Sequence, residues 1–197
     1  MNQANLQAKM NILTAAKKLF AIQGYEKTTV RQICDEAGVN LMMVSYHFRG
    51  KENVLSAIFQ TFMPLVSASN SIEELKDPVK RIKQIIYEIT SLRIKDPDLV
   101  IVMQQLILCL APQNELVKWI IIPIWKELRD LLVLGKDCGL FMFDSVDITL
   151  TFVISSILMF KHWDFFDLIL QDPGEDNDSL AKEASKFVLN ALNYRGY

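Results

Sequence analysis

Glycine, histidine and cysteine are scarce in this chain of 197 residues, which contains seven Gly, two His and three Cys. The few glycines form no Gly-rich phosphate loop and no nucleophile elbow, and the two histidines lack the spacing of a zinc protease. The cysteines, Cys34, Cys109 and Cys138, are odd in number and widely separated. We therefore expect no disulfide framework, no metal and no cofactor, and the missing catalytic signatures argue against an enzyme.

Long hydrophobic runs are absent as well. The two longest, residues 99–111 and 148–160, are interrupted by paired Gln and paired Ser residues. They fall short of the roughly 18 apolar residues that cross a bilayer, so buried helices are expected instead of membrane spans. The first residues show no charged-then-apolar leader, because Lys9, Lys17 and Lys18 are interspersed in an amphipathic pattern. We expect a cytoplasmic protein with no membrane partner.

The most informative stretch present is residues 28–48, which predicts two short helices joined by a tight turn. Thr29 is placed to cap the first helix while Gln32 reaches back to it. Gly38 fits the left-handed conformation that ends this helix, and Asn40 is placed to cap the second. The first helix carries apolar residues at helical spacing: Val30, Ile33, Cys34 and Ala37. This arrangement is typical of a DNA-reading helix-turn-helix.

The second of these helices has two distinct faces. Its inward stripe is predicted to be Leu41, Val44 and Phe48. Its outward side chains, which would enter a major groove, are predicted to be Met42, Met43, Tyr46 and His47, with Ser45 near the border. Paired short helices also occur in bundles that touch no DNA, so the spacing by itself leaves both interpretations open.

A resemblance favours the first interpretation. The segments AAKKLFAIQGYEKTTV (residues 15–30) and YHFRGKENVL (residues 46–55) resemble the amino-terminal domain of TetR-family transcriptional regulators. The resemblance covers about the first third of the chain. It implies an all-α, TetR-like fold with a three-helix DNA-binding head at residues 1–66 and a larger helical ligand-binding and dimerisation domain at 67–197. It also implies a homodimeric repressor that binds a palindromic double-stranded DNA operator and is released by an apolar small-molecule effector.

The resemblance assigns roles to individual positions. Thr29 and Lys51 would hold phosphates, Arg31 would reach a base edge, and Tyr46 and His47 would contact the backbone or the groove floor. Helix N-termini and cations suit phosphates, and Arg suits guanine. The full predicted DNA-binding set is Thr28, Thr29, Arg31, Leu41, Met42, Met43, Ser45, Tyr46, His47 and Lys51.

The chain departs from the family's pattern at Leu41-Met42-Met43, where many members have Lys, Gly and Thr, and at Ser45, where Tyr is common. Apolar side chains contact the thymine C5-methyl group, so an A·T-rich half-site is expected, with Arg31 as the main guanine reader. In the alternative, the head has weak or no DNA binding and these apolar residues contact a protein, which makes the chain a co-regulator. A helical enzyme that uses a cavity in the body is a third reading.

Charge is divided unequally along the chain. Residues 1–60 hold seven Lys and Arg against four Asp and Glu, whereas the remainder holds fourteen against nineteen. Phosphate neutralisation supplies much of the affinity of proteins for DNA. The modest positive excess in the first part therefore supports a DNA-binding head.

The remaining segments predict helices. A first helix with Leu6, Met10, Leu13, Ala16 and Phe20 on one face ends at Gly24, and another runs from Lys51 to about Val66. A soft domain boundary is placed at the small polar residues 67–71. Further helices are expected at about 82–92, 99–110, 115–136, 146–170 and 180–192, and Pro123 should kink or split the third of these.

Two sets of body residues are candidates for function. The ligand-pocket candidates are Met103, Gln104, Gln105, Trp119, Trp125, Phe141, Phe160 and Trp163. For each aromatic residue, ordinary core packing is the alternative. The last two helices should form a four-helix bundle across a two-fold axis, with candidate contacts at Phe152, His162, Phe187, Val188 and Ala191.

Overall fold

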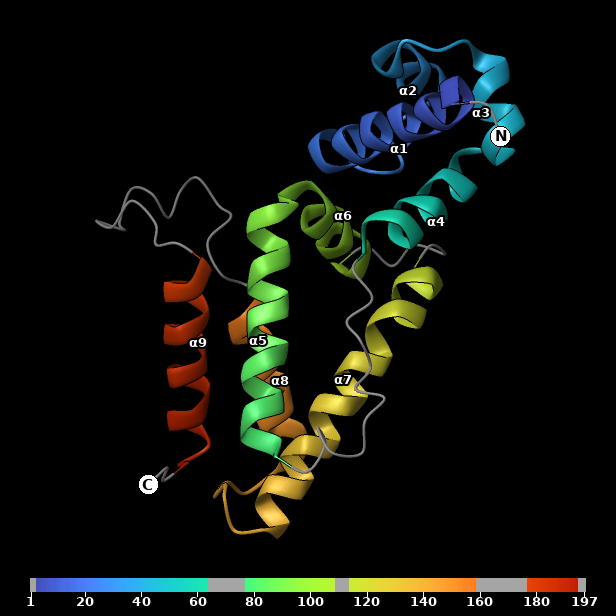
Figure 1. Ribbon diagram of the computed structural model, residues 1–197. Coiled ribbons are helices and arrows are strands. Elements are labelled where there is room, and N and C mark those ends of the chain that lie inside the picture. Colours follow the sequence, from blue (N-terminus) through green and yellow to red (C-terminus); the bar gives the residue numbers. More distant parts are fainter. Residues whose placement is uncertain (1–2, 64–76, 109–113, 159–176, 195–197) are drawn as a thin grey trace. The chain divides into compact units, whose positions relative to one another are not determined.

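The computed structural model describes residues 3–63, 77–108, 114–158 and 177–194, and within these ranges it consists of α-helices and contains no strand (Figure 1). The predicted all-α fold is confirmed. The chain forms two compact units, Met1–Leu65 with Asp96–Ile120 and Val66–Lys95 with Ile121–Tyr197. None of the described helices is both long and apolar enough to cross a membrane.

The first unit is built around α1 (Gln3–Gln23), which contacts α2 (Val30–Ala37), α4 (Lys51–Phe62) and α6 (Pro97–Leu108). Between α2 and α4 lies α3 (Leu41–Phe48). The predicted apolar face of α1 is buried from Leu13 to Phe20, whereas Leu6 is exposed. The core of this unit comprises Ile12, Leu13, Ala16, Phe20, Ile33, Val44, Val54, Leu55, Ile58 and Phe59.

Polar contacts fix α6 to α1 within this unit. The Lys17 ammonium pairs with the Asp96 carboxylate at 2.5 Å and lies 4.1 Å from the centroid of the Phe62 ring on α4. Asp96 also accepts a hydrogen bond from the Leu99 backbone N–H at 3.2 Å, so it caps α6. Gln105 donates to the Ala21 carbonyl at 3.0 Å. The sequence had placed α6 with the body, but the helix packs on the head; the predicted boundary itself, after residue 66, lies outside the described residues.

The second unit comprises α5 (Pro78–Lys95), the greater part of α7 (Asn114–Asp137), α8 (Val146–Leu158) and α9 (Asn177–Ala191). Its core includes Ile82, Ile85, Ile86, Leu128, Leu131, Leu132, Phe141, Val153, Ile157, Val188, Leu189 and Leu192. Of the kink or split predicted at Pro123, the split does not occur, because α7 is continuous through this residue. A proline removes one backbone donor, and the remaining turns keep the helix intact.

A buried ion pair crosses this core. The Arg81 guanidinium, which is 1% exposed, donates from Nε and Nη2 to the two Glu127 carboxylate oxygens at 2.6 and 3.1 Å. Glu88 lies 3.5 Å from Arg81 Nη1 and accepts a hydrogen bond from Gln84. The hydrogen bonds that Arg81 donates to Glu127 raise the pKa of Arg81, against the opposing effect of burial. These contacts link α5 to α7.

Candidate nucleic-acid interface

The turn between α2 and α3 has the geometry that the sequence predicted. The Thr29 hydroxyl accepts from the Gln32 N–H at 3.3 Å, and the Gln32 side chain accepts from the Thr29 N–H at 2.8 Å, which completes a capping box. Gly38 ends α2 in the left-handed region at φ +66°, where a side chain is disfavoured. The Asn40 side chain then accepts from the Met43 N–H at 3.1 Å and caps α3. Local hydrogen bonds therefore hold the two helices at a fixed junction.

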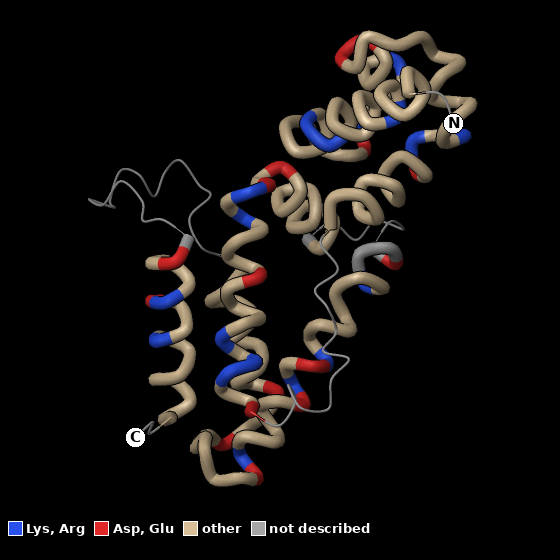
Figure 2. Tube along the Cα trace, viewed as in Figure 1, with Lys and Arg blue, Asp and Glu red and all other residues tan. Residues whose placement is uncertain are grey.

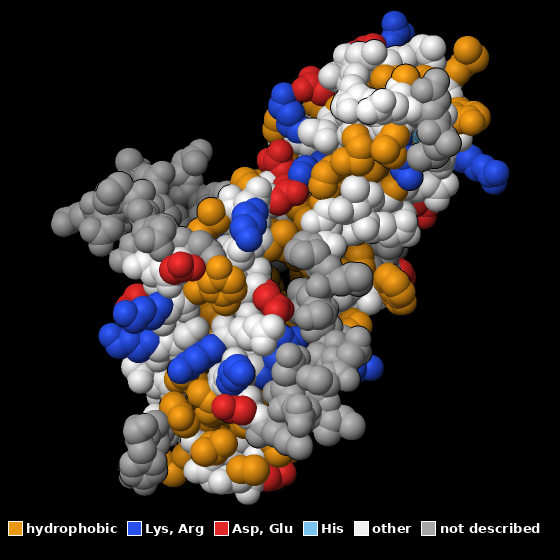
Figure 3. Space-filling view, viewed as in Figure 1, with side chains coloured by type: hydrophobic (Ala, Val, Ile, Leu, Met, Phe, Trp, Pro, Cys, Tyr) orange, Lys and Arg blue, Asp and Glu red, His pale blue; other side chains and the backbone are white. Residues whose placement is uncertain are grey.

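The outer face of α3 is exposed and carries no formally charged side chain of Lys, Arg, Asp or Glu. Val44 and Phe48 are buried beneath the helix, as predicted, whereas Met42 and Tyr46 are 76% and 72% exposed. The prediction that Leu41 faces inward is wrong: its side chain is 58% exposed, because the buried stripe begins only at Val44. The helix carries no Lys, Arg, Asp or Glu, so it is tan throughout in Figure 2, and hydrophobic side chains reach the surface of this unit in Figure 3.

Other α3 positions are less accessible. Met43 and His47 are half-buried, and Ser45 is exposed with its hydroxyl donating to the Leu41 carbonyl at 3.4 Å. The His47 ring lies edge-on to Tyr46, with 5.0 Å between their centroids. The Nε2 atom of His47 is buried and has no hydrogen-bond partner among the described residues. Leu41, Met42 and Tyr46 are therefore the large side chains that α3 presents to solvent.

Thr28 does not belong to this surface. It is 1% exposed, and its hydroxyl donates to the Gly24 carbonyl at 2.8 Å and accepts from the Gln23 amide at 3.1 Å. The predicted DNA contact by its side chain is wrong, because the hydroxyl closes the turn after α1. No local sequence signal separates this buried Thr from the exposed Thr29 beside it.

Lys51 also differs from expectation. Its ammonium donates to the carbonyls of Tyr25, Glu26 and Thr28 at 2.8, 3.4 and 3.0 Å, and it lies 4.2 Å from the centroid of the Tyr25 ring. An ammonium has three N–H donors, and these carbonyls use all of them. In this arrangement Lys51 holds the loop between α1 and α2 instead of offering a free charge to phosphate.

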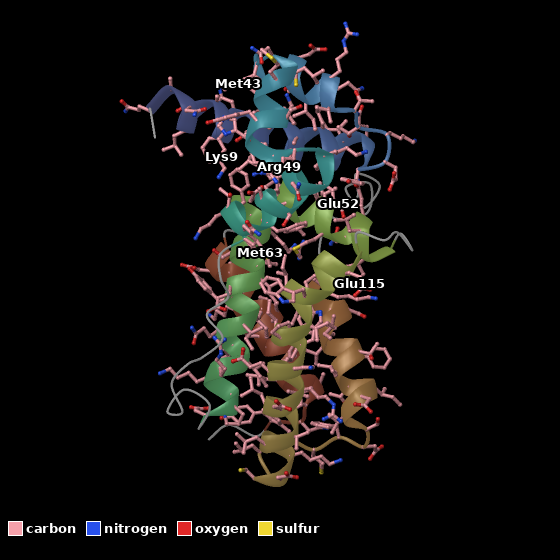
Figure 4. All side chains as sticks on the ribbon, turned by 90° about the vertical axis from the view of Figure 1, so that its right-hand side faces the viewer. Lys9, Met43, Arg49, Glu52, Met63 and Glu115 are labelled. Carbon is pink, nitrogen blue, oxygen red and sulfur yellow. The ribbon has the colours of Figure 1, made fainter. Side chains whose placement is uncertain are left out.

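Two exposed cations flank α3. Arg31 lies in the first turn of α2, and Arg49 directly follows α3 with a left-handed backbone at φ +60° (Figure 4). Neither forms an ion pair with a described residue. Lys18, in contrast, pairs with Glu36 at 2.6 Å, and this contact raises its pKa. Sequence analysis did not single out Arg49, although its position between Phe48 and Gly50, at the end of the helix, was a usable signal.

The predicted pocket residues do not gather in one described cavity. In the first unit Met103 is buried, Gln105 bonds to α1 and Trp119 is exposed. In the second unit Phe141 is a core residue packed against Gly135, which corrects its assignment to a pocket. Trp125 packs partly buried against the same core, Gln104 is half-buried, and Phe160 and Trp163 lie outside the described residues.

The described residues do form a groove of about 740 Å³ between α5 and α9, and none of the predicted pocket residues lines it. Tyr87, Ala181 and Leu189 contribute apolar surface, and Lys83, Lys182 and Lys186 contribute charge. The predicted ligand site therefore has no counterpart in this groove.

The predicted dimer contacts fall into three groups. Phe152 and Phe187 are 72% and 65% exposed, and Ala191 is exposed. Val188 is 2% exposed and packs in the core, so its assignment to an interface is wrong; it lies about 100° around α9 from the exposed Phe187. His162 lies outside the described residues.

Comparisons with known proteins agree with this geometry. The sequence model of the family described as "Bacterial regulatory proteins, tetR family" matches residues 12–58, which include α2 and α3. The probable HTH-type transcriptional regulator YttP of Bacillus subtilis is 27% identical over 90 residues, 44% of each chain. The HTH-type transcriptional regulator HbdR of Aromatoleum sp. is 32% identical over 78 residues, which cover 39% of this chain and 34% of HbdR. These matches span less than half the length of either relative.

Solved structures extend the similarity to nearly the whole chain. HlyIIR, a hemolysin II transcriptional regulator, superimposes with a TM-score of 0.76 at 27% identity over 97% of this chain and 99% of HlyIIR. FadR from Bacillus subtilis, solved in complex with stearoyl-CoA, has a TM-score of 0.67 at 20% identity over 93% of this chain and 98% of FadR, which is a likeness of fold. Residues 12–58 therefore carry the sequence pattern of the TetR family, and the fold of nearly the whole chain resembles that of the transcriptional regulator HlyIIR.

Proposed function

We propose that this protein binds a palindromic operator in double-stranded DNA as a homodimer, represses transcription, and is released by an apolar small-molecule effector. The observation that carries the proposal is the exposed outer face of α3, which stands on buried Val44 and Phe48 and is fixed by caps at Thr29 and Asn40. A helix presented in this way fits a major groove of DNA, while the preceding helix, here α2, crosses the sugar-phosphate backbone. The proposed site of action is the cytoplasm, and the proposed role involves no catalysis.

Individual contacts follow from exposure and chemistry. The backbone N–H groups of Val30 and Arg31 precede the first hydrogen bond of α2, and a helix N-terminus attracts phosphate. The Arg31 side chain is exposed and suits a guanine edge, and Arg49 is placed at the other end of the site for a phosphate. Tyr46 offers a ring and a hydroxyl to the groove.

Homodimerisation is supported by apolar stripes on the second unit. Ile148 and Phe152 are spaced by four residues on α8 and are 61% and 72% exposed, and Phe187 and Ala191 repeat this spacing on α9. Such stripes at helical spacing are what a four-helix bundle buries. A two-fold axis through the bundle requires a palindrome with half-site centres about one DNA turn, roughly 34 Å, or a multiple of it apart.

Effector release requires a link between ligand binding and the head. Within the first unit, Lys17 joins α1 to the capped start of α6 and to Phe62 on α4, so a shift of α6 acts directly on α1 and α4. A coupling free energy of about 1–3 kcal/mol lowers operator affinity about 5- to 150-fold.

Selection from a pool of random-sequence DNA duplexes tests the proposal. The full-length protein should enrich a palindrome, and Arg31→Ala should weaken binding to it by about 1–3 kcal/mol. Arg129→Ala is the matched control, because Arg129 is an exposed cation that pairs with Asp147 in the second unit. Failure to enrich any duplex would overturn the proposal, as would equal losses in the two variants.

A second candidate is favoured by the exposure of Leu41 and Met42, which would also suit contact with a protein partner. In that case the chain is a co-regulator with the same fold. It would enrich no duplex in the selection, and its partner would have to be sought among proteins.

A further inference from the structure

The exposed face of α3 lacks the side chains that form bidentate hydrogen bonds to bases. Bidentate readout of guanine uses Arg or Lys, and that of adenine uses Asn or Gln. None of these residue types occurs between Leu41 and Phe48. The Ser45 hydroxyl already donates within the helix, to the Leu41 carbonyl. The first turn of α3 therefore meets a major groove with Leu41 and Met42, neither of which donates a hydrogen bond from its side chain.

This apolar exposure is not explained by packing within the head. The inward face of α3 is complete with Val44 at 1% and Phe48 at 5% exposed. Leu41 begins the same helical stripe but is 58% exposed, and Met42, about 100° around the helix from it, is 76% exposed. Together these two side chains offer an exposed apolar surface at the start of α3.

One group in the major groove matches this chemistry. Among the four base-pair orientations, the C5-methyl group of thymine is the apolar feature, and its position separates T·A from A·T. Methionine is unbranched and polarisable, so its side chain adapts to a methyl group and its neighbours. Building on the proposed function, we propose that Leu41 and Met42 read thymine methyl groups, so that thymine is specified by apolar contact and Arg31 reads guanine separately.

The test uses the duplex enriched by the full-length protein from the random pool. Each thymine is replaced in turn by deoxyuridine, which removes the methyl group and leaves base pairing intact. Loss of one buried methyl group corresponds to about fourfold weaker binding, and replacement in both half-sites to roughly fifteenfold. The loss should appear at one or two adjacent thymines in each half-site and at no other position.

A cycle of protein and DNA changes assigns the methyl group to its side chain. In Met42→Ala the sensitivity to deoxyuridine at the contacted position should disappear, because the partner of the methyl group is gone. Met42 is largely exposed, so this change leaves the fold intact. Ile22→Ala is the matched control, since Ile22 is a 70% exposed residue on α1 of the same unit and its loss should leave the sensitivity unchanged.

The outcomes separate this inference from the proposed function. Enrichment of a duplex with loss at specific thymines, abolished by Met42→Ala, would support both. Enrichment of a duplex that tolerates deoxyuridine at every position would overturn methyl readout and leave the regulator in place. If no duplex is enriched, DNA binding itself fails and methyl readout falls with it, which leaves the protein-contact role for Leu41 and Met42.

Discussion

The charged side chain of Lys51 positions the loop between α1 and α2. Its ammonium bonds to three carbonyls of the loop between α1 and α2 and lies over the Tyr25 ring. That loop ends at Thr29, the cap of α2, so Lys51 determines where the N-terminus of α2 lies. We therefore expect Lys51 to affect the proposed DNA binding through the backbone that it holds.

Replacing Lys51 with Met should lower the free energy of unfolding by about 2 kcal/mol, because hydrogen bonds to charged groups are lost. It should weaken DNA binding while leaving the slope of log K against log salt unchanged. A lost phosphate contact would instead reduce that slope by about 1. Denaturant titration measures the free energy of unfolding, and DNA binding at several salt concentrations measures the slope. Lys27→Met is the control, because Lys27 is an exposed lysine of the same loop.

The two described cysteines should differ in reactivity. Cys34 is buried, and burial raises the pKa of its thiol, whereas Cys138 is exposed. The thiolate is the reactive form, so at pH 8 an alkylating reagent should label Cys138 quickly and Cys34 only when the head opens. Peptide mass spectrometry of a time course measures this. Equal rates at the two sites would show that the core of the first unit is open.

At the scale of elements, the turn between α2 and α3 depends on one backbone conformation. Gly38 lies at φ +66°, and an added Cβ would meet no atom within 4 Å. A substitution here therefore tests backbone strain free of steric clash. The same turn carries the orientation of α3 relative to α2.

Gly38→Ala should cost about 1–2 kcal/mol of stability, because alanine is disfavoured in the left-handed region. Gly38→Asn should cost less, since asparagine visits this region more readily. Thermal unfolding of the two variants gives the comparison. If alanine and asparagine were equally tolerated, the turn would adopt a different conformation from the one described.

The sequence was most informative where structure is determined by near neighbours. The caps at Thr29 and Asn40 and the turn at Gly38 depend on residues within three or four positions, and all were predicted. Predictions failed where the sequence does not show which side chains are buried or how far they reach. The Thr28 hydroxyl bonds to the Gly24 carbonyl only four residues away, yet no local pattern shows that Thr28 is buried. Lys51 reaches carbonyls 23 to 26 residues away. Leu41 was predicted to be buried because helical periodicity shows which face of α3 a residue occupies. It does not show how far along α3 the neighbouring helices cover that face.

The link between α5 and α7 is a second element-scale feature. Glu127→Ala should destabilise the second unit by about 3–5 kcal/mol, because it leaves the buried Arg81 guanidinium without its bidentate partner. Asp147→Ala should cost under about 1 kcal/mol, since its pair with Arg129 is exposed. Chemical denaturation of both variants gives the difference. Similar losses in the two would contradict the buried pair.

At the scale of the whole molecule, the proposed symmetry depends on exposed aromatic residues of the second unit. Phe187→Glu should weaken self-association by on the order of a hundredfold or more, because the charge enters an apolar interface twice. Phe187 is exposed, so the helical content of the protomer should be unchanged. Sedimentation velocity measures self-association and circular dichroism measures helical content, with Ile22→Glu as the control. An unchanged dimer in Phe187→Glu would place the interface elsewhere.

The central claim is that this chain is a DNA-binding regulator, and the salt dependence of DNA binding tests it most directly. Affinity of the full-length protein for its selected palindrome should be measured between about 50 and 200 mM salt, beside a duplex of shuffled sequence. We expect log K to fall linearly with log salt with a slope of about −0.9 for each phosphate neutralised, and the palindrome to bind more tightly throughout. Absence of binding at the lowest salt, or equal affinity for the two duplexes, would contradict the account.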